Sequence, residues 1–254
     1  NEIGQVDFKQ ILSYLIMQSI CGIIAYLITS KYFKRSIPES IIWALTVALS
    51  NHVTLLLPIT EIYFQQNVIT QVASIILMDG VILLSVIAFF LELSTKKNVN
   101  LFTFIKNLFL NPFILSIVIG LLFLLLNFNI DQTPIEYTLS KLAACVSPVG
   151  LFAIGIILSF YTENVINKLS VSISILKLII SPIILLLIGL LFFNAGLPAE
   201  IPGAFFVSVA PCGVTAIVLC SAYNVSPENI IKAIFVSTIA SIGTIFFAIK
   251  YLTL

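Results

Sequence analysis

The chain alternates long apolar runs with short polar connections, and this pattern predicts its elements. The runs are close to the roughly 20 residues that an α-helix needs to cross about 30 Å of hydrocarbon. They are far longer than the alternating strands of about 10 residues that form a membrane barrel. The pattern therefore predicts eight membrane-spanning helices, at residues 10–29, 41–64, 69–91, 111–128, 139–160, 171–193, 203–223 and 230–252.

Two of these runs are interrupted by helix breakers. The second run holds Pro58, and the seventh holds the stretch "VAPCGVTA", in which Gly213 follows Pro211. A proline removes an intrahelical hydrogen bond, and in lipid the freed carbonyl must be satisfied by protein or by a water-filled cavity. Two interrupted helices in corresponding positions are typical of a transporter binding site. The alternative is a simple kink, which we expect at Pro148 and Pro182.

The order of the runs predicts an inverted repeat. The polar stretch 92–110 leaves three runs before it and five after it. Because the chain starts at Asn1 without a methionine, we expect two further helices before it, which would complete a five-plus-five arrangement. Both broken helices would then be fourth in their halves, and would cross near the bilayer midplane. The predicted fold is an all-α, polytopic membrane bundle, with eight of its ten helices in this chain.

The composition agrees with a membrane protein. Hydrophobic residues make up 60% of the 254 residues and charged residues only 9%, whereas a soluble domain carries about 25% charged residues. The formal net charge of +1 gives no reason to expect nucleic acid as a partner. The four cysteines lie in apolar runs without a zinc or redox spacing. We therefore expect the lipid bilayer as a partner, and neither a metal nor a cofactor.

Lysine and arginine residues orient the predicted helices. By the positive-inside rule, the more basic set of alternating loops is cytoplasmic. We therefore expect a multi-pass protein of the cell (inner) membrane, with loops 30–39, 92–110 and 161–170 on the cytoplasmic side. Lys177 is expected to extend its side chain to this face, and the alternative is that it attracts an anion near a cytoplasmic vestibule. Nine of the twelve basic residues fall in this set, namely Lys31, Lys34, Arg35, Lys96, Lys97, Lys106, Lys168, Lys177 and Lys232.

Several motifs follow one another in a characteristic order along nearly the whole chain. They are "SNHVTLLLP", "LNPFILSIVIGLL", "SPVGLFAIGIILS", "LKLIISPIILL" and "VAPCGVTAIVLCSAYNVSPENIIKAIFVSTIAS". In this order and spacing the chain resembles the auxin efflux carrier family, which includes plant auxin carriers and bacterial permeases described as malate or malonate carriers. The resemblance implies that the broken helices cross at Pro58 and Pro211. It also implies a transport core over residues 10–91 and 171–252, and a scaffold over 111–160 that commonly dimerises.

The polar residues of the second run depart partly from that family. The family pattern has an asparagine seven residues before the proline, here Asn51, but His52 is not the usual next residue, and Leu56 stands where glycine is frequent. An amide both donates and accepts hydrogen bonds, which suits a carboxylate ligand or an unwound carbonyl. Histidine can carry a proton near neutral pH. The alternatives are a helix-to-helix hydrogen bond for Asn51 and a structural role for His52.

Asp79 lies near the middle of the third run. A carboxylate at this depth costs at least a few kcal/mol, about 2.5–3.5 on insertion scales, so it is a functional candidate by default. Protonation of Asp79 or His52 would couple transport to protons. No family motif assigns Asp79 this role.

The second wall of the expected substrate site is the seventh run. Half-helix N-termini carry about half a positive charge and free N–H groups, which suit an anion without a buried arginine or lysine. The residues expected to bind substrate are Asn51, His52 and Pro58 in the first wall, with Ser208, Pro211, Cys212, Gly213 and Thr215 in the second.

The function that these features favour is secondary transport of a small organic anion, such as a carboxylate, by alternating access. An intramembrane enzyme would need paired aspartates, aspartate-rich motifs or a histidine cluster. The predicted spans hold one aspartate and one histidine, so we do not expect the protein to be an enzyme. A channel would need rings of charge or a filter loop. A sodium-coupled symporter of the related bile-acid type shares the crossed helices, but would need clustered oxygen ligands around the crossover.

Overall fold

The computed structural model describes residues 8–95, 112–126, 128, 130–161, 163–194 and 197–253. Within these ranges the regular structure is helical and no strand forms, so the all-α membrane bundle is confirmed. The connection expected over 92–110 lies largely outside the described residues, as does residue 111 of the fourth predicted run.

In the part of the chain that the structure describes, five continuous spans are long and apolar enough to cross a membrane. Each coincides with a predicted run to within a few residues at its ends, and the fourth run contains the shorter helix α7 (Pro112–Leu125). Three spans include a π-helical turn, labelled η. The five spans are α1 (Phe8–Leu27) with η2 (Ile28–Tyr32); α4 (Gln66–Met78) with η4 (Asp79–Leu83) and α5 (Leu84–Thr95); α8 (Pro134–Ser159); α9 (Lys168–Ile175) with η5 (Leu176–Ile180) and α10 (Ser181–Phe193); and α13 (Glu228–Thr253).

The second and seventh spans are broken, as predicted. The second consists of α2 (Ile37–Ala48), the π-helical turn η3 (His52–Leu56) and α3 (Leu57–Tyr63), and the seventh of α11 (Pro202–Ser208) and α12 (Thr215–Ala222). The second break lies around Pro211, but the first lies at Leu49–Asn51 and not at Pro58. Pro58 sits in the first turn of α3, which continues η3 without a gap.

The carbonyl that Pro58 leaves free is satisfied by another helix. Thr54 lies four residues before Pro58, so a proline at that position cannot donate an N–H to the Thr54 carbonyl. The hydroxyl of Ser147, on α8, donates to this carbonyl instead. Prolines at the other two predicted kinks do not break their spans, since Pro148 lies inside α8 and Pro182 in the first turn of α10.

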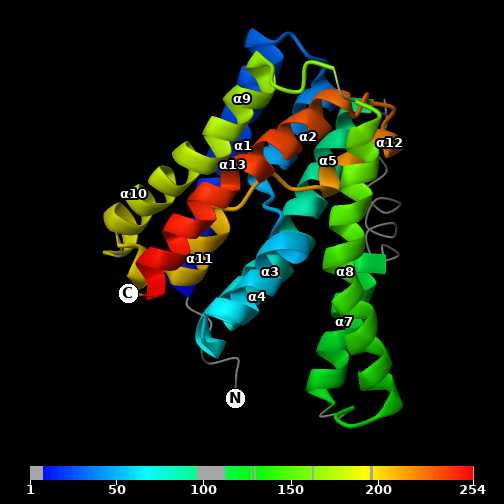
Figure 1. Ribbon diagram of the computed structural model, residues 1–254, viewed down its shortest axis with the longest axis vertical. Helices are drawn as coiled ribbons and strands as arrows, with labels where there is room; N and C mark the ends of the chain where they lie inside the picture. Colours follow the sequence, from blue (N-terminus) through cyan, green and yellow to red (C-terminus); the bar gives the residue numbers. More distant parts are fainter. Residues whose placement is uncertain are drawn as a thin grey trace.

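The two breaks cross near the middle of the bundle, where the linkers of α2–η3 and α11–α12 meet (Figure 1). Ser50 and Cys212 form an antiparallel bridge there. The Asn51 N–H donates to the Pro211 carbonyl at 2.9 Å, and the Gly213 N–H donates to the Thr46 carbonyl at 3.2 Å. The predicted crossing of the broken helices is therefore present as direct backbone pairing.

Most spans pack around this crossing. α1 contacts α2 and α10, α9 contacts α13, and α11 contacts α4. α7 and α8 lie together at one side, next to α5, and project beyond the other helices (Figure 1). None of the described residues of α8 is buried. The division into a transport core and a scaffold stays a prediction, which this arrangement suits.

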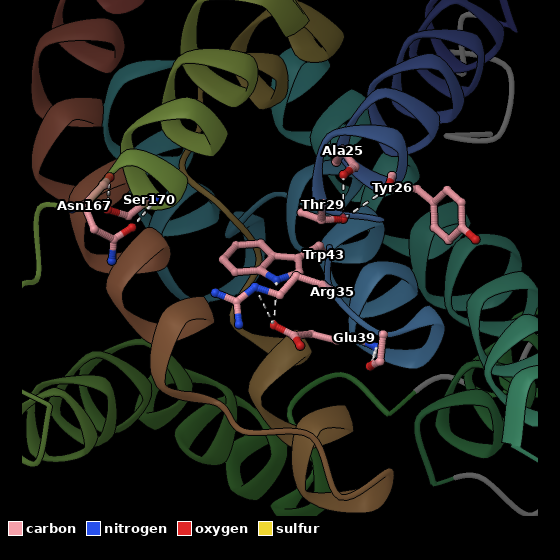
Figure 2. Close-up of polar contacts among 9 residues, drawn as sticks. Ala25, Tyr26, Thr29, Arg35, Glu39, Trp43, Asn167 and Ser170 are labelled. Carbon is pink, nitrogen blue, oxygen red and sulfur yellow. Dashed lines mark hydrogen bonds and ion pairs between the residues drawn. The ribbon is translucent and has the colours of Figure 1, made fainter. Parts of the chain in front are cut away.

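Local signals fix one end of the bundle, shown in Figure 2. The Ser36 hydroxyl accepts the Glu39 N–H at 3.3 Å and so caps α2. The Glu39 carboxylate also accepts the indole N–H of Trp43 at 3.5 Å and lies 3.6 Å from Nε of Arg35. At the start of α9, Asn167 and Ser170 exchange two hydrogen bonds in a capping box. Within the predicted loops 30–39 and 161–170, side-chain hydrogen bonds therefore fix where α2 and α9 begin.

Gly213 provides the first test of the crossing. A Cβ atom at this position would lie 2.8 Å from both the Cβ and the carbonyl oxygen of Leu49. We expect Gly213→Ala to force the two linkers apart and to lower stability by about 1–3 kcal/mol, the usual effect of overpacking. The measurement is thermal unfolding of the purified protein in detergent.

Gly243, in α13, is the matched control because a Cβ there meets nothing within 4 Å. Gly243→Ala should be neutral or stabilise by up to about 1 kcal/mol. Equal melting temperatures for the two variants would contradict the close approach at Gly213.

Candidate functional site

The crossover brings four helix ends together. α2 and α11 arrive by their C-terminal ends, which carry partial negative charge, while η3 and α12 leave by their N-terminal ends, which carry partial positive charge. The prediction considered only N-terminal ends facing an anion. The structure therefore offers a region suited to an anion and, beside it, a region suited to a cation.

A buried polar cluster lies at the start of η3. His52 Nε2 is 3.1 Å from Oδ2 of Asp79, which lies at the start of the π-helical turn η4 and is fully buried. Asn51 precedes η3 and is 3% exposed; its Oδ1 accepts a hydrogen bond from the Thr54 hydroxyl. The structure thus joins three of the predicted residues from two helices. We call Asn51, His52 and Asp79 the polar cluster.

Each member of the polar cluster has a buried atom without a hydrogen-bond partner. These atoms are Asn51 Nδ2, His52 Nδ1 and Asp79 Oδ1. Leaving a buried polar group unpaired costs about 1–3 kcal/mol, and more for a charged group. An amide N–H donates, a carboxylate oxygen accepts, and an imidazole nitrogen does either according to its tautomer. The polar cluster can therefore bind a ligand with both donors and acceptors.

The second predicted wall is largely engaged with protein. The Cys212 N–H donates to the Ser237 hydroxyl at 3.2 Å, and Ser208 donates to the Phe205 carbonyl in its own helix at 2.7 Å. The Gly213 N–H and the Pro211 carbonyl are used in the crossing itself. Thr215 begins α12 and is half-buried. A substrate-binding role for these residues stays a prediction, with Thr215 the member whose side chain is most accessible.

Lys177 does not extend to the membrane surface as predicted. It is fully buried in η5, and its Nζ donates to the Val47 carbonyl at 2.9 Å and to the Ser50 hydroxyl at 2.8 Å. The sequence does contain a signal for this burial, namely the distance of Lys177 from the end of its span. Lys177 lies nine residues beyond Lys168, the first residue of α9, which is about 14 Å at 1.5 Å per residue. That distance is too long for the side chain to reach the helix end.

Ser50 connects four helices at the crossing, and the sequence analysis did not single it out. Its hydroxyl donates to the Val207 carbonyl at 2.9 Å. It accepts from Lys177 at 2.8 Å and lies 3.3 Å from the hydroxyl of Tyr14, on α1. A serine hydroxyl has one donor and two acceptor positions, so all three are used if Tyr14 is the donor. The only signal in the sequence is that Ser50 directly precedes Asn51.

A groove of about 620 Å³ runs along α1, α2, η4 and α5, and reaches the crossover at Ala48. Its lining is mostly apolar, and the buried amide oxygen of Gln18 in it has no hydrogen-bond partner. Its lining does not include the residues of the polar cluster. The candidate site is therefore defined by the polar cluster, and the groove is a separate feature beside it.

Comparison with known families matches residues 4–249 to a family described as membrane transport protein. The match includes both broken helices, the polar cluster, Ser50 and Lys177. None of the curated proteins compared with the chain matches it.

The Ser50 connection gives a second test. Ser50→Ala would leave Lys177 Nζ without one acceptor and the Val207 carbonyl without its donor, both in buried surroundings. We expect a loss of stability of about 1–3 kcal/mol, measured by thermal unfolding in detergent.

Ser172 is the matched control, because it is only half-buried on α9 and its hydroxyl bonds to a carbonyl of its own helix, four residues earlier. Ser172→Ala should change stability by less than about 0.5 kcal/mol. A Ser50→Ala protein as stable as Ser172→Ala would show that Ser50 does not hold the crossing together.

Proposed function

We propose that the chain is a secondary transporter of a small organic anion such as a carboxylate. The premise is that it belongs to the family of membrane transport proteins that includes the auxin efflux carriers. The observation that carries this proposal is the polar cluster at the crossing of the two broken helices. It combines buried, unpaired donor and acceptor atoms with the start of a helix.

Asn51 is proposed to bind the anion directly. It lies at the N-terminal end of the helix formed by η3 and α3, where the peptide dipoles favour negative charge. Its Nδ2 is buried and unpaired, whereas its Oδ1 is held by Thr54. This orientation presents a donor to the ligand, which suits the oxygen atoms of a carboxylate.

The charge of Asp79 makes a proton part of the proposal. Two like charges about 4 Å apart at an effective dielectric constant of about 20 repel by about 4 kcal/mol. That repulsion exceeds the about 1–3 kcal/mol expected from one buried hydrogen bond to Asn51. We therefore propose that the His52–Asp79 pair takes up a proton when the anion binds, so that transport is coupled to protons.

Alternating access is proposed to occur where α8 meets η3. The Ser147 hydroxyl holds the Thr54 carbonyl, and a Cβ atom on Gly150 would lie 2.9 Å from Cγ2 of Thr54. α8 therefore contacts the broken helix within one turn of the polar cluster. Relative movement of these two helices would open the polar cluster to one side and then to the other.

The surroundings of the transporter complete the proposal. We propose that it lies in the cell (inner) membrane, with the basic loops on the cytoplasmic side. The described residues of α8 are unburied and many are large apolar side chains, which suits a scaffold that faces lipid or a second copy of the chain.

The experiment that tests this function is a thermal-shift screen of mono- and dicarboxylates on the purified full-length protein, including malate and malonate. We expect at least one carboxylate to raise the melting temperature and to be taken up by proteoliposomes. Stabilisation only by organic cations or neutral solutes would contradict the proposed substrate class.

Asn51→Ala tests the binding residue. Removing the amide donor should weaken binding of the carboxylate identified in the screen by about 1–3 kcal/mol, measured by calorimetry. Asn67→Ala, an exposed change at the start of α4, serves as the control and should leave affinity unchanged. Wild-type affinity in Asn51→Ala would mean that Asn51 only joins the helices of the bundle.

Asp79→Asn tests proton coupling. Amide and carboxylic acid have nearly the same shape, but only the acid can lose a proton. We expect proteoliposome uptake by the variant to lose its pH dependence while carboxylate binding stays measurable. Glu61→Gln, at an exposed carboxylate on α3, should keep the wild-type pH dependence. Unchanged pH dependence in Asp79→Asn would assign coupling to His52 or remove it from the mechanism.

A further inference from the structure

Lys177 binds one residue that precedes the first break and one within it, whereas the polar cluster begins with Asn51, the last residue of the break. Its Nζ bonds to the carbonyl of Val47, in the last turn of α2, and to the hydroxyl of Ser50. The C-terminal end of a helix carries a partial negative charge and carbonyls without intrahelical partners. The amine of Lys177 is therefore placed where the backbone favours a positive charge.

The atoms around Lys177 Nζ are those that would bind a free monovalent cation. In carriers with broken helices, unwound carbonyls and half-helix C-terminal ends coordinate sodium ions or protons. The Val47 carbonyl is such a group, and the Ser50 hydroxyl adds a second neutral oxygen. Among the residues that the structure describes, no group of three or more histidine, cysteine, aspartate or glutamate side chains could hold a metal ion.

The sequence also brings Lys177 to this place in a specific way. It lies inside η5, and a π-helical turn inserts an extra residue into a helix, which changes the direction of the side chains around it. Such turns are frequent at functional sites. Ser181, at the end of this turn, donates to the Leu176 carbonyl five residues earlier at 3.1 Å. The turn that aims Lys177 is thus itself supported by a side chain.

We propose that Lys177 is a tethered cation that occupies the cation site of the crossover, so that the protein needs no free sodium ion to hold its broken helices together. The ammonium takes the position of a coupling ion but cannot leave during transport. This inference rests on the geometry around Nζ and does not depend on which anion the polar cluster binds. It separates this chain from the sodium-coupled alternative, in which the same oxygens would bind an exchangeable ion.

The experiment measures thermal unfolding of the purified full chain in detergent, in sodium chloride, methylammonium chloride or choline chloride at equal ionic strength. Wild type should melt at the same temperature in all three salts. Lys177→Ala removes the ammonium and leaves room beside Val47 and Ser50. It should melt lower in choline, and saturating methylammonium or sodium should recover at least half of the loss, because both can reach the freed oxygens while choline is too bulky.

Two control variants distinguish the loss of a bound cation from a general loss of packing. Lys177→Met fills the space without a charge, so it should be destabilised and should not be recovered by any of the salts. Lys232→Ala removes another buried lysine, whose Nζ lies 2.6 Å from the half-exposed Glu228 carboxylate. Because that partner stays hydrated, Lys232→Ala should show no preference among the three salts.

Two results would overturn the proposal. One is a saturable, sodium-specific rise in the melting temperature of wild type, which needs no variant and would show that a free ion still binds. The other is a folded Lys177→Ala protein that melts alike in all three salts. A Lys177→Ala protein that can be purified in methylammonium or sodium but not in choline would support the proposal.

Discussion

In hydrocarbon, each backbone N–H or carbonyl that leaves its helix must be paired within the protein, and two helices break at the same depth here. The structure meets this constraint by letting the breaks pair with each other, through Asn51 to Pro211 and Gly213 to Thr46. Side chains from other helices bind further backbone groups near the breaks. Ser147 takes the Thr54 carbonyl, and Ser237 accepts the Cys212 N–H. The positions of the candidate residues on the two broken helices follow from this pairing.

The same break brings two helix ends of opposite partial charge together. Ser50 and Asn51 are neighbours in the chain, yet Ser50 receives the amine of Lys177 while Asn51 lies with the His52–Asp79 pair. The first residue belongs to the C-terminal end of a helix and the second to the N-terminal end of the next one. A single interruption of the backbone therefore supplies opposite partial charges within a few ångströms, which a continuous helix at this depth could not do.

Sequence reasoning predicted the spans, the two broken helices and their crossing, because long apolar runs and prolines act locally or through simple topology. It placed the first break at Pro58 instead of Leu49–Asn51, because the sequence alone does not show that another helix binds the carbonyl that the proline leaves free, so that the chain stays helical through Pro58. It missed Ser50, whose role depends on residues up to 157 positions away. It misplaced Lys177 because a π-helical turn has no recognised residue pattern, although the depth of the lysine argued against a surface position.

Pro58 has a consequence beyond the shape of its helix. In an uninterrupted helix the Thr54 carbonyl would be bound within its own segment, and separating it would mean melting a turn. With proline at position 58, that carbonyl is bound by a hydroxyl on α8. A side-chain hydrogen bond between membrane helices averages about 0.6 kcal/mol, close to thermal energy. Pro58 thus replaces a backbone hydrogen bond within one helix by a weaker side-chain hydrogen bond between two helices. The two helices can separate at this bond without either of them unfolding.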